Sequence, residues 1–514
     1  MTRYLLAILL CLGAGSLSAR QVQVHINADQ GGPTINKNIY GHFAEHLGRC
    51  IYGGFYVGDD NTEIPNTNGV RNDVVEALKD LKVPVLRWPG GCFADTYHWM
   101  DGIGPKEDRP TIVNQWWGGV TEDNSFGTHD FLNMCEMLDA EPYLAANVGS
   151  GEVKELADWV QYVNHDGTSP MADLRRENGR EEPWQVTYWG VGNEMWGCGG
   201  NMTPEYYANL YKQYATFMTD WSNSSNLFRI ASGANVADYH WTEVLMRDIP
   251  KHLIEGVALH SYSFVEWNEK GPATGFSEAQ YFSTMETALR MEELVTRHST
   301  IMDKYDPEKR IALVVDEWGG WYNVEEGTNP GFLYQQNTMR DAMIAGTTLN
   351  IFNNHADRVR MANLAQTINV LQAVILTEDE KMLLTPTYHV MKMYNVHQDA
   401  TLLPLSISSG AQYEFEGKSL PAVSGSASVN EEGAIHISLV NIDADEAQEV
   451  TVNLRGTDNK KVSGTILKAA NLTDHNTFDN PDKVQPVAYK DFKRKGESMT
   501  LQLPPFSVVV LKVE

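Results

Sequence analysis

The sequence predicts a (β/α)8 barrel, also called a TIM barrel, followed by a C-terminal all-β sandwich. Between residues 36 and 385, short apolar runs typical of strands alternate with stretches of helical periodicity. Beyond residue 385, strand-like runs follow one another with no long helical pattern between them. The 514 residues leave room for a barrel of about 250 residues or more and for a second domain. A doubly wound open sheet is the alternative that the same alternation allows.

Eight apolar runs supply the strands of the predicted barrel. They are residues 39–44, 83–88, 143–148, 186–192, 228–232, 256–260, 311–315 and 348–352. Two of the intervening helices have clear starts. Asn72 can cap a helix with one apolar face, and Thr203-Pro204 can cap and begin a helix that runs through Trp221.

The C-terminal region is rich in strands that are separated by Gly, Asp and Asn turns. The runs are residues 434–442, 448–454, 461–468 and 506–513, and residues 22–26 near the N-terminus are expected to add one strand to them. The expected division of the chain is an export signal at 1–19, an N-terminal segment of the sandwich at 20–35, the catalytic barrel at 36–385 and the sandwich at 386–514.

The N-terminus has the pattern of an export signal. Arg3 precedes an apolar run at residues 4–12, and the small residues Ser16, Ser18 and Ala19 follow. A short buried helix or strand is the alternative. The pattern predicts cleavage after Ala19 and a periplasmic or extracellular protein. No other segment of the sequence is long and apolar enough to predict a membrane span.

Charge and cysteine content narrow the function classes. The formal net charge of -27 argues against nucleic acid as a partner, because phosphate binding needs a basic surface. Outside the predicted signal, the cysteines show no CxxC pair and no regular spacing, so a zinc site is not expected. They are Cys50, Cys92, Cys135 and Cys198. Disulfides among them are possible, but the sequence does not give the pairing.

Two carboxylates follow predicted strands at the point where each strand ends. The fourth strand leads into Asn193-Glu194, and the seventh leads into Asp316-Glu317. Most of the 67 Asp and Glu residues are expected to be solvated, but a polar group that ends a buried strand needs a reason. Strands four and seven face each other across a barrel mouth, so Glu194 and Glu317 can converge. Such a pair is the minimum apparatus for glycoside hydrolysis. Strand alternation points Asp316 to the other side.

Aromatic and polar rings surround these carboxylates. Trp and Tyr rings can stack on sugar C–H faces. The candidates near the two strand ends are Trp189, Trp196, Trp318, Trp321 and Tyr322. His260 and Tyr262 end the sixth strand, where either could hydrogen-bond a carboxylate of the seventh. A purely structural histidine is the alternative for His260.

Four stretches carry a family resemblance. Residues 187–202 (TYWGVGNEMWGCGGNM) resemble the acid/base motif of glycoside hydrolase family 51, the α-L-arabinofuranosidases. The Asn-Glu pair alone would indicate only the wider clan. Residues 39–54 (IYGHFAEHLGRCIYGG), 86–99 (LRWPGGCFADTYHW) and 315–322 (VDEWGGWY) add specificity for the family.

The resemblance implies an exo-acting, retaining enzyme with no metal and no cofactor. It implies that Glu194 is the acid/base and Glu317 the nucleophile. Substrates would be the terminal non-reducing α-L-arabinofuranosyl groups of arabinan, arabinoxylan or their oligosaccharides, and a homo-oligomer is possible. By motif position, the sugar contacts would be Glu45, Asn193, His260, Tyr262 and Gln366, with Trp117 and Trp321 as aromatic walls.

The chain departs from some members of the family at one position, and rival functions stay open. Cys92 stands where those members have Asn, and Trp116 competes with Trp117 for the aromatic wall. The nearest rivals are β-xylosidase or endoglucanase specificity on the same scaffold. A non-catalytic carbohydrate-binding protein is disfavoured by the two carboxylates and Asn193. Scattered His and Cys residues disfavour a metal-dependent hydrolase.

Overall fold

Eight parallel strands close into a barrel at the centre of the chain. The computed structural model describes residues 22–221, 226–408, 410–457 and 461–514. In order around the barrel, its strands are β2 (Gly41–Phe43), β5 (Val85–Trp88), β8 (Glu141–Ala146), β9 (Tyr188–Val191), β10 (Phe228–Asn235), β11 (Gly256–Ser263), β12 (Ala312–Gly320) and β13 (Val359–Leu364). The predicted (β/α)8 barrel is confirmed, and its closure excludes the open sheet.

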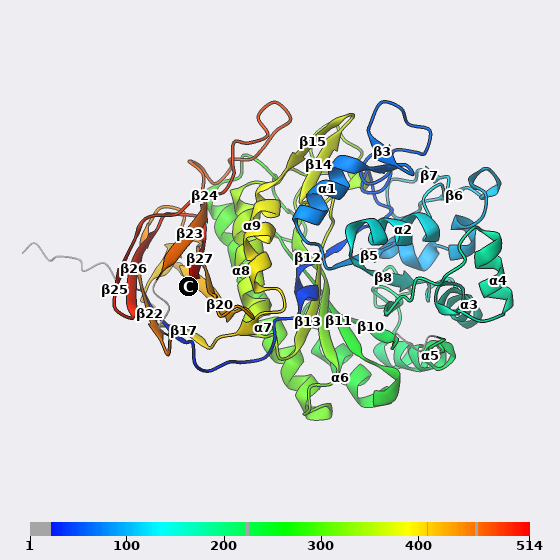
Figure 1. Ribbon diagram of the computed structural model, residues 1–514, viewed down its shortest axis with the longest axis horizontal. Helices are drawn as coiled ribbons and strands as arrows, with labels where there is room; N and C mark the ends of the chain where they lie inside the picture. The colour runs from blue at the N-terminus through cyan, green and yellow to red at the C-terminus, as the bar shows by residue number, and fades with distance from the viewer. Residues whose placement is uncertain (1–21, 222–225, 409, 458–460) are drawn as a thin grey trace, which may run out of the picture.

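Helices follow the barrel strands and pack around them (Figure 1). They are α1 (Asn72–Asp80), α2 (Thr128–Leu138), α3 (Val153–Asn164), α4 (Pro170–Glu177), α5 (Pro204–Phe217), α6 (Tyr239–Asp248), α7 (Glu278–Tyr305) and α8 (Met339–Asn354). Thr203 caps α5 as predicted, because its side chain accepts a hydrogen bond from the Tyr206 amide, but the helix ends at Phe217, before Trp221. Asn72 is the first residue of α1 rather than its side-chain cap.

The expectation of a strand at residues 348–352 is wrong. These residues lie in α8, which begins with a capping box formed by Thr338 and Asp341. Every residue of α8 from Met339 to Asn353 is buried, the polar ones included, so the helix has no solvent-exposed face whose polar residues would mark a helical period. A short apolar run then has the same appearance as a buried strand. The eighth strand is β13.

The C-terminal strands form two antiparallel-rich sheets, which confirms the predicted all-β sandwich. The five-stranded sheet has the order β17 (Leu405–Ser408), β1 (Val22–Asn27), β22 (Gln448–Arg455), β26 (Ser498–Leu503) and β25 (Phe492–Lys495). The six-stranded sheet has the order β16 (Thr401–Leu402), β20 (Val423–Val429), β21 (Ile435–Asn441), β27 (Ser507–Val513), β23 (Val462–Leu467) and β24 (Val487–Ala488). Strand β1 comes from the other end of the chain and pairs in parallel with β22.

Two helices connect the barrel to the sandwich. Helix α8 contacts β12 of the barrel and also β20 and β21 of the sandwich. Helix α9 (Pro386–Tyr394) packs against α8, and both lie between the two domains in Figure 1. Among the described residues, four two-stranded sheets lie outside the barrel and the sandwich: β3 (Asn66–Thr67) with β4 (Val70–Arg71), β6 (Ile112–Val113) with β7 (Thr121–Glu122), β14 (Ile375–Glu378) with β15 (Lys381–Leu384), and β18 (Gln412–Phe415) with β19 (Lys418–Pro421).

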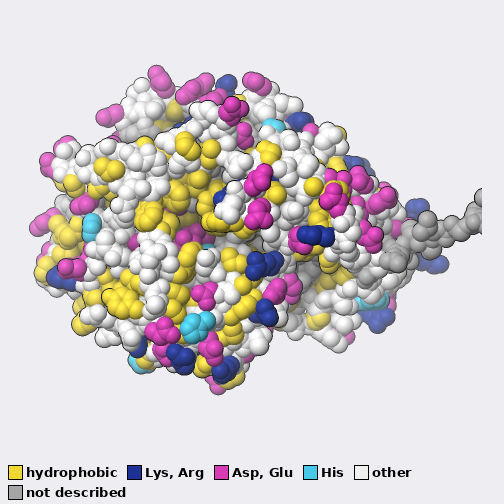
Figure 2. Space-filling model, turned by 180° about the vertical axis from the view of Figure 1, so that it is seen from behind, with side chains coloured by type: hydrophobic (Ala, Val, Ile, Leu, Met, Phe, Trp, Pro, Cys, Tyr) yellow, Lys and Arg dark blue, Asp and Glu magenta, His cyan; other side chains and the backbone are white. Residues whose placement is uncertain are grey.

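The surface agrees with the acidic composition. On the face shown in Figure 2, acidic side chains are spread over the molecule, and hydrophobic side chains border a central hollow. Across the described ranges, none of the helices has the combination of length and apolar character that a membrane crossing requires.

Candidate active site

A cavity of about 410 Å³ lies at the carboxyl ends of the barrel strands. Residues at or just beyond the ends of most of the strands line it: Glu45 after β2, Cys92 after β5, Glu194 after β9, Asn235 in β10, His260 and Tyr262 in β11, Glu317 in β12 and Gln366 after β13. This is the end of the barrel where (β/α)8 enzymes carry their reactive groups.

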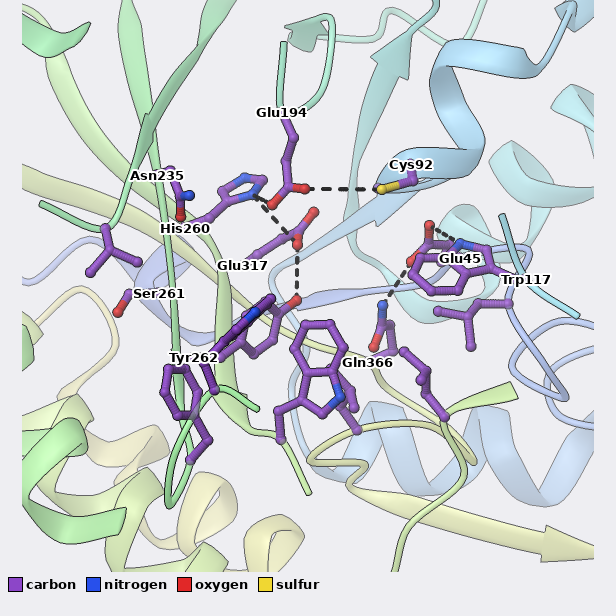
Figure 3. A pocket seen from close by; sticks show the side chains of 18 of the residues that line it. Glu45, Cys92, Trp117, Glu194, Asn235, His260, Ser261, Tyr262, Glu317 and Gln366 are labelled. Carbon is purple, nitrogen blue, oxygen red and sulfur yellow. Dashed lines mark hydrogen bonds and ion pairs between the residues drawn. The ribbon is translucent and has the colours of Figure 1, made fainter. Parts of the chain in front are cut away.

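Glu194 and Glu317 meet in this cavity (Figure 3). One carboxylate oxygen of each, together with a His260 ring nitrogen, lies in a group whose members are all within 4.8 Å of one another. His260 Nδ1 lies 2.8 Å from Glu194 Oε1 and 3.5 Å from Glu317 Oε2. The structure therefore brings together the two carboxylates that the sequence places on strands four and seven.

Both oxygens of Glu317 are held by donors. Arg87 Nη1 donates to Oε1 at 2.9 Å, and the Tyr262 hydroxyl donates to Oε2 at 2.8 Å. Arg87 also donates from Nη2 to Asn193 Oδ1 at 2.6 Å. A single buried guanidinium thus fixes the orientation of Glu317 and of the amide that precedes Glu194.

Glu194 has a different environment. Burial raises the pKa of Glu194, and the neighbouring charge of Glu317 raises it further, while the hydrogen bond with His260 acts in the opposite direction. The net direction is upward, so the protonated form of Glu194 is favoured. The two carboxyl groups therefore differ in their surroundings, which is what an acid and a nucleophile need.

His260 bridges three acidic side chains. Its Nε2 lies 3.1 Å from Asp316 Oδ1, and its Nδ1 faces Glu194 and Glu317. Burial alone would lower the pKa of His260, but the charges of Glu317 and Asp316 outweigh it and raise the pKa to about 10. His260 is therefore an imidazolium that donates from both ring nitrogens.

The expectation that Asp316 points away from the site is wrong. Asp316 also faces the barrel interior, where it accepts a hydrogen bond from the Tyr143 hydroxyl at 2.7 Å and contacts His260. The register of β12 shifts between Val315 and Trp318 where it pairs with β13, so simple alternation fails here. Burial would raise the pKa of Asp316, but Arg87 and His260 lower it overall.

A second cluster surrounds Glu45. Trp117 Nε1 donates to Glu45 Oε1 at 2.9 Å, and Gln366 Nε2 donates to Oε2 at 2.7 Å. Burial, and then the charge of Glu317, raise the pKa of Glu45 to about 8. Trp117 lines the cavity, whereas Trp116 is 38% exposed and does not. Trp117 is thus the ring that faces the site.

The aromatic candidates divide into two groups. Trp196 and Trp321 line the cavity. Trp189, Trp318 and Tyr322 are buried in the hydrophobic core and do not line it, so the interpretation of these three as sugar-stacking rings is wrong. Aromatic residues near a strand end pack into the core as readily as into a site.

Several site residues were missed by sequence reasoning. Arg87 has a signal, because it is a charged residue between Leu86 and Trp88 in a strand that is otherwise apolar, and such a charge needs a partner. Trp267 lines the cavity and is 54% exposed, with its ring 5.7 Å from that of Trp321. Its loop carries no pattern that sequence reasoning could use.

The structure also gives the cysteine pairing that the sequence left open. Cys92 and Cys198 form a disulfide, while Cys50 and Cys135 are buried free thiols. The bonded sulfurs leave no free thiolate beside Glu194, and both nitrogens of His260 already serve carboxylates. Of the two potential ligand groups that include Glu194 in the described part of the chain, the one with Cys92 and Cys198 therefore has no thiolate to offer a metal.

Comparison with known proteins identifies related sequences. Residues 77–270 match the alpha-L-arabinofuranosidase 1 domain, and residues 316–507 match the alpha-L-arabinofuranosidase C-terminal domain. The chain is 55% identical to an intracellular exo-alpha-L-arabinofuranosidase of Bacteroides ovatus, over 97% of each chain. It is 34% identical to alpha-L-arabinofuranosidase C of Emericella nidulans, over 84% of this chain and 86% of that one.

Solved structures give the same relationship. A GH51 arabinofuranosidase from Xanthomonas axonopodis pv. citri shares 48% identity, with a TM-score of 0.94 over 96% of this chain and all of that chain (100%). An alpha-L-arabinofuranosidase from Thermotoga maritima shares 30% identity, with a TM-score of 0.84 over 96% and 100% of the two chains. A family 44 xyloglucanase from Paenibacillus polymyxa, at 12% identity and a TM-score of 0.61, shares the fold alone.

The expectation of export is contradicted by these comparisons. The Bacteroides ovatus relative, which matches 97% of this chain, is named as an intracellular enzyme. The expectation rests on Arg3, the apolar run at 4–12 and the small residues Ser16, Ser18 and Ala19. This is a short local pattern that a protein retained inside the cell can also have. The predicted signal at 1–19 lies outside the described residues.

Proposed function

Because this chain belongs to glycoside hydrolase family 51 and is an exo-acting, retaining α-L-arabinofuranosidase, we propose that Glu194 and Glu317 carry out its reaction. Glu194 is the acid/base and Glu317 the nucleophile. The observation that supports this pair is their proximity, with one oxygen of each carboxyl within 4.8 Å of the other. Retaining enzymes separate the two groups by about 5–5.5 Å, and inverting enzymes by about 6.5–9.5 Å.

The first displacement forms a covalent arabinosyl-enzyme. A carboxylate oxygen of Glu317 attacks the anomeric carbon, and the bond from that carbon to the leaving oxygen breaks. Glu194 gives its proton to the leaving oxygen, which departs as an alcohol. Arg87 and Tyr262 hold Glu317 in place for the attack, since each donates to one of its oxygens.

The second displacement reverses the proton transfer. Glu194 removes a proton from water, the water oxygen bonds to the anomeric carbon, and the ester bond to Glu317 breaks. The charge of Glu317 is one of the causes that raise the pKa of Glu194, and ester formation removes that charge. The pKa of Glu194 therefore falls in the intermediate, which suits its change from acid to base.

Asn193 and Gln366 have polar atoms that can form hydrogen bonds with sugar hydroxyls. Arg87 occupies Asn193 Oδ1, and Asn193 Nδ2 donates to Cys198 Sγ at 3.8 Å, so the second Nδ2 proton is left to donate to the sugar 2-hydroxyl. Gln366 donates from Nε2 to Glu45, and its buried Oε1 has no partner among the described residues, so it is free to accept from a sugar hydroxyl. Trp117 and Trp321 provide the apolar walls.

Azide rescue tests the two roles. Glu317→Ala should abolish turnover of every arabinofuranoside, and azide should restore it with inversion. Glu194→Ala should lose roughly 10²–10⁴-fold on oligosaccharides, whose leaving oxygen needs a proton, yet still form the intermediate from an activated aryl substrate. Azide should then give the product with retained configuration. Equal losses on both kinds of substrate, or an inverted azide from Glu194→Ala, would contradict the assignment.

The natural substrate is proposed as arabinan, arabinoxylan or their oligosaccharides. The test compares L-arabinose release from linear arabino-oligosaccharides and from arabinose-substituted xylo-oligosaccharides, alongside a panel of aryl glycosides. Free arabinose should be the product from either polymer class. Comparable turnover of an aryl β-xyloside, or release of longer fragments, would argue for one of the rival specificities.

A further inference from the structure

The disulfide between Cys92 and Cys198 joins two loops that build the catalytic cavity. Cys92 begins the short helix that follows β5, and Cys198 lies in the loop that follows β9. Strand β8 separates β5 from β9 in the barrel, so the bond spans one intervening strand. Both cysteines are half-buried, and Cys92 lines the cavity.

The loop that Cys198 anchors begins with the acid/base itself. Glu194 has a φ of 43°, in the left-handed region that non-glycine residues rarely adopt. Its carbonyl accepts hydrogen bonds from the amides of Gly197 at 2.7 Å and Gly199 at 3.1 Å. A Cβ on Gly199 would lie 2.0 Å from the Asn193 carbonyl oxygen, so the loop is tightly folded. The disulfide ties Cys198, near the end of this loop, to Cys92 of the loop that follows β5.

The disulfide also faces one oxygen of the Glu194 carboxyl. Oε2 lies 3.5 Å from Cys198 Sγ. It lies 4.0 Å from Cys92 Sγ, and this second contact is drawn in Figure 3. Bonded sulfurs carry no proton, so neither can donate a hydrogen bond to Oε2. The other oxygen, Oε1, accepts from His260. Oε2 is therefore the oxygen left to hold the transferable proton.

We propose that the Cys92–Cys198 disulfide is a positioning element for the acid/base, which anchors the loop that begins at Glu194 and keeps hydrogen-bond donors away from its Oε2. This inference depends on the proposed role of Glu194. It predicts that the enzyme works best in the oxidised state, and that reduction moves the pH dependence of the first displacement.

Reduction changes the chemistry at Oε2 in a definite direction. A dithiol gives two electrons and two protons to the disulfide, so Cys92 and Cys198 become thiols and the reductant becomes a disulfide. A thiol can donate to Oε2, and a donor stabilises the ionised carboxylate. Glu194 would then lose its proton at lower pH. The alkaline limb of kcat/KM should therefore shift to lower pH, by about half to one pH unit for a weak donor.

Reduction does not alter the other charged groups that shift the pKa of Glu194. Glu317 raises the pKa of Glu194, while His260 and Arg87 lower it. None of the three contains sulfur, so a thiol reductant does not alter them chemically. A change on reduction can therefore be assigned to the cysteines.

The experiment measures kcat/KM against pH for the full chain, before and after treatment with dithiothreitol, with thiol titration to count the reduced cysteines. Arabino-oligosaccharide and an activated aryl arabinofuranoside are the substrates. We expect the downward shift of the alkaline limb and a severalfold loss on the oligosaccharide, with a smaller loss in the formation of the intermediate from the aryl substrate. The aryl group leaves without a proton, so it depends less on Glu194.

Two double variants distinguish the effect of hydrogen-bond donors beside Glu194 Oε2 from the effect of the covalent link between the two loops. Cys92→Ser with Cys198→Ser places hydroxyl donors beside Oε2, so its alkaline limb should lie at lower pH than that of the reduced wild type. Cys92→Ala with Cys198→Ala removes the anchor without adding donors, so kcat should fall while the limb stays closer to that of the oxidised enzyme. Neither should respond to dithiothreitol. Cys135→Ala, in a buried free thiol of α2, is the matched control and should respond like the wild type.

The outcomes distinguish this inference from the proposed function. If the reduced wild type and the Ser variant both keep the oxidised profile, the positioning inference is overturned while the roles of the carboxylates stand. A response to dithiothreitol that survives in the Ala variant also overturns it. If Glu194→Gln retains the alkaline limb of the wild type, the proposed function itself fails.

Discussion

At the scale of single residues, burial and one neighbouring charge give the two carboxyl groups different properties. Burial raises the pKa of Glu194, and the charge of Glu317 adds to that effect. Glu317 lies against Arg87, Tyr262 and His260, which all present donors to it. The different neighbours of Glu194 and Glu317 thus suit one carboxyl group to act as the acid and the other as the nucleophile.

Neutralising Glu317 should lower the pKa of Glu194. In Glu317→Gln the carboxylate charge is gone, so the proton on Glu194 is held less tightly and is lost at lower pH. Carbon-13 NMR titration of the Glu194 carboxyl measures the change. Tyr262→Phe is the matched control, because it removes a contact of Glu317 but leaves its charge. An unchanged or higher pKa in Glu317→Gln would contradict the electrostatic account.

Arg87 should prove essential although it does not take part in proton transfer. Arg87→Met removes donors from both Glu317 and Asn193, and kcat/KM should fall by about 10²–10³-fold at an intact fold. Arg87→Lys should also be impaired, because an ammonium cannot reproduce the two-pronged contact.

Arg71→Met provides the comparison for Arg87. Arg71 is equally buried, but it serves Asp73 and backbone carbonyls near Asp379. The Arg71→Met substitution should lower the melting temperature and leave the kcat/KM of the folded enzyme largely unchanged. Equal activity losses in the two variants would mean that Arg87 acts through stability alone.

Much of the site could be predicted from residues that end strands. Glu194, Glu317, His260 and Tyr262 all occupy such positions, and the structure brings them together. Arg87 and the inward turn of Asp316 could not be found in this way, because they depend on partners from other strands. The disulfide pairing depends on two loops more than a hundred residues apart in sequence (106).

At the scale of elements, register and burial explain where sequence reasoning failed. Alternation placed Asp316 and Glu317 on opposite sides, but the register shift in β12 lets both face the interior. The apolar run at residues 348–352 predicts a strand, but it belongs to helix α8, whose residues from Met339 to Asn353 are all buried. In both cases, contacts with other parts of the fold decide the structure, and the local sequence pattern does not contain them.

Strand β1 offers a test at this scale, because its residues alternate between the core and the surface. Ile26 is fully buried, so Ile26→Ala should cost about 2–5 kcal/mol and lower the denaturant midpoint. His25, the neighbour on the other face, is half-buried, and His25→Ala should cost much less. Chemical denaturation of both variants checks this. Equal losses would mean that β1 is not held by its buried face.

At the scale of the whole molecule, helix α8 links the two domains. It contacts the barrel strand β12 on one side and the sandwich strands β20 and β21 on another. A Cβ on Gly346 in this helix would lie 2.8 Å from Val440 Cγ2 of the sandwich, so the domains approach closely here. The sandwich therefore completes the burial of a barrel helix.

This contact predicts that barrel and sandwich unfold together. Differential scanning calorimetry of the full chain should give one transition rather than two. Gly346→Val, which crowds the interface, should lower the temperature of that single transition. Two well-separated transitions, of which Gly346→Val shifts neither, would mean that the domains are thermodynamically independent.

The position of β1 has a consequence for how the chain is made. Val24 pairs with Val452, which lies 428 residues later (452 minus 24). At about 5–20 residues per second, a ribosome needs roughly 20–90 s to produce that partner. Its other neighbour in the sheet, β17, is also made late, since Val24 pairs there with Ile407. For most of this interval the first described strand therefore has no neighbour in its sheet, although its apolar side chains are already exposed. The nascent chain must therefore be shielded, by a chaperone or by its own early barrel, until its last fifth has left the ribosome.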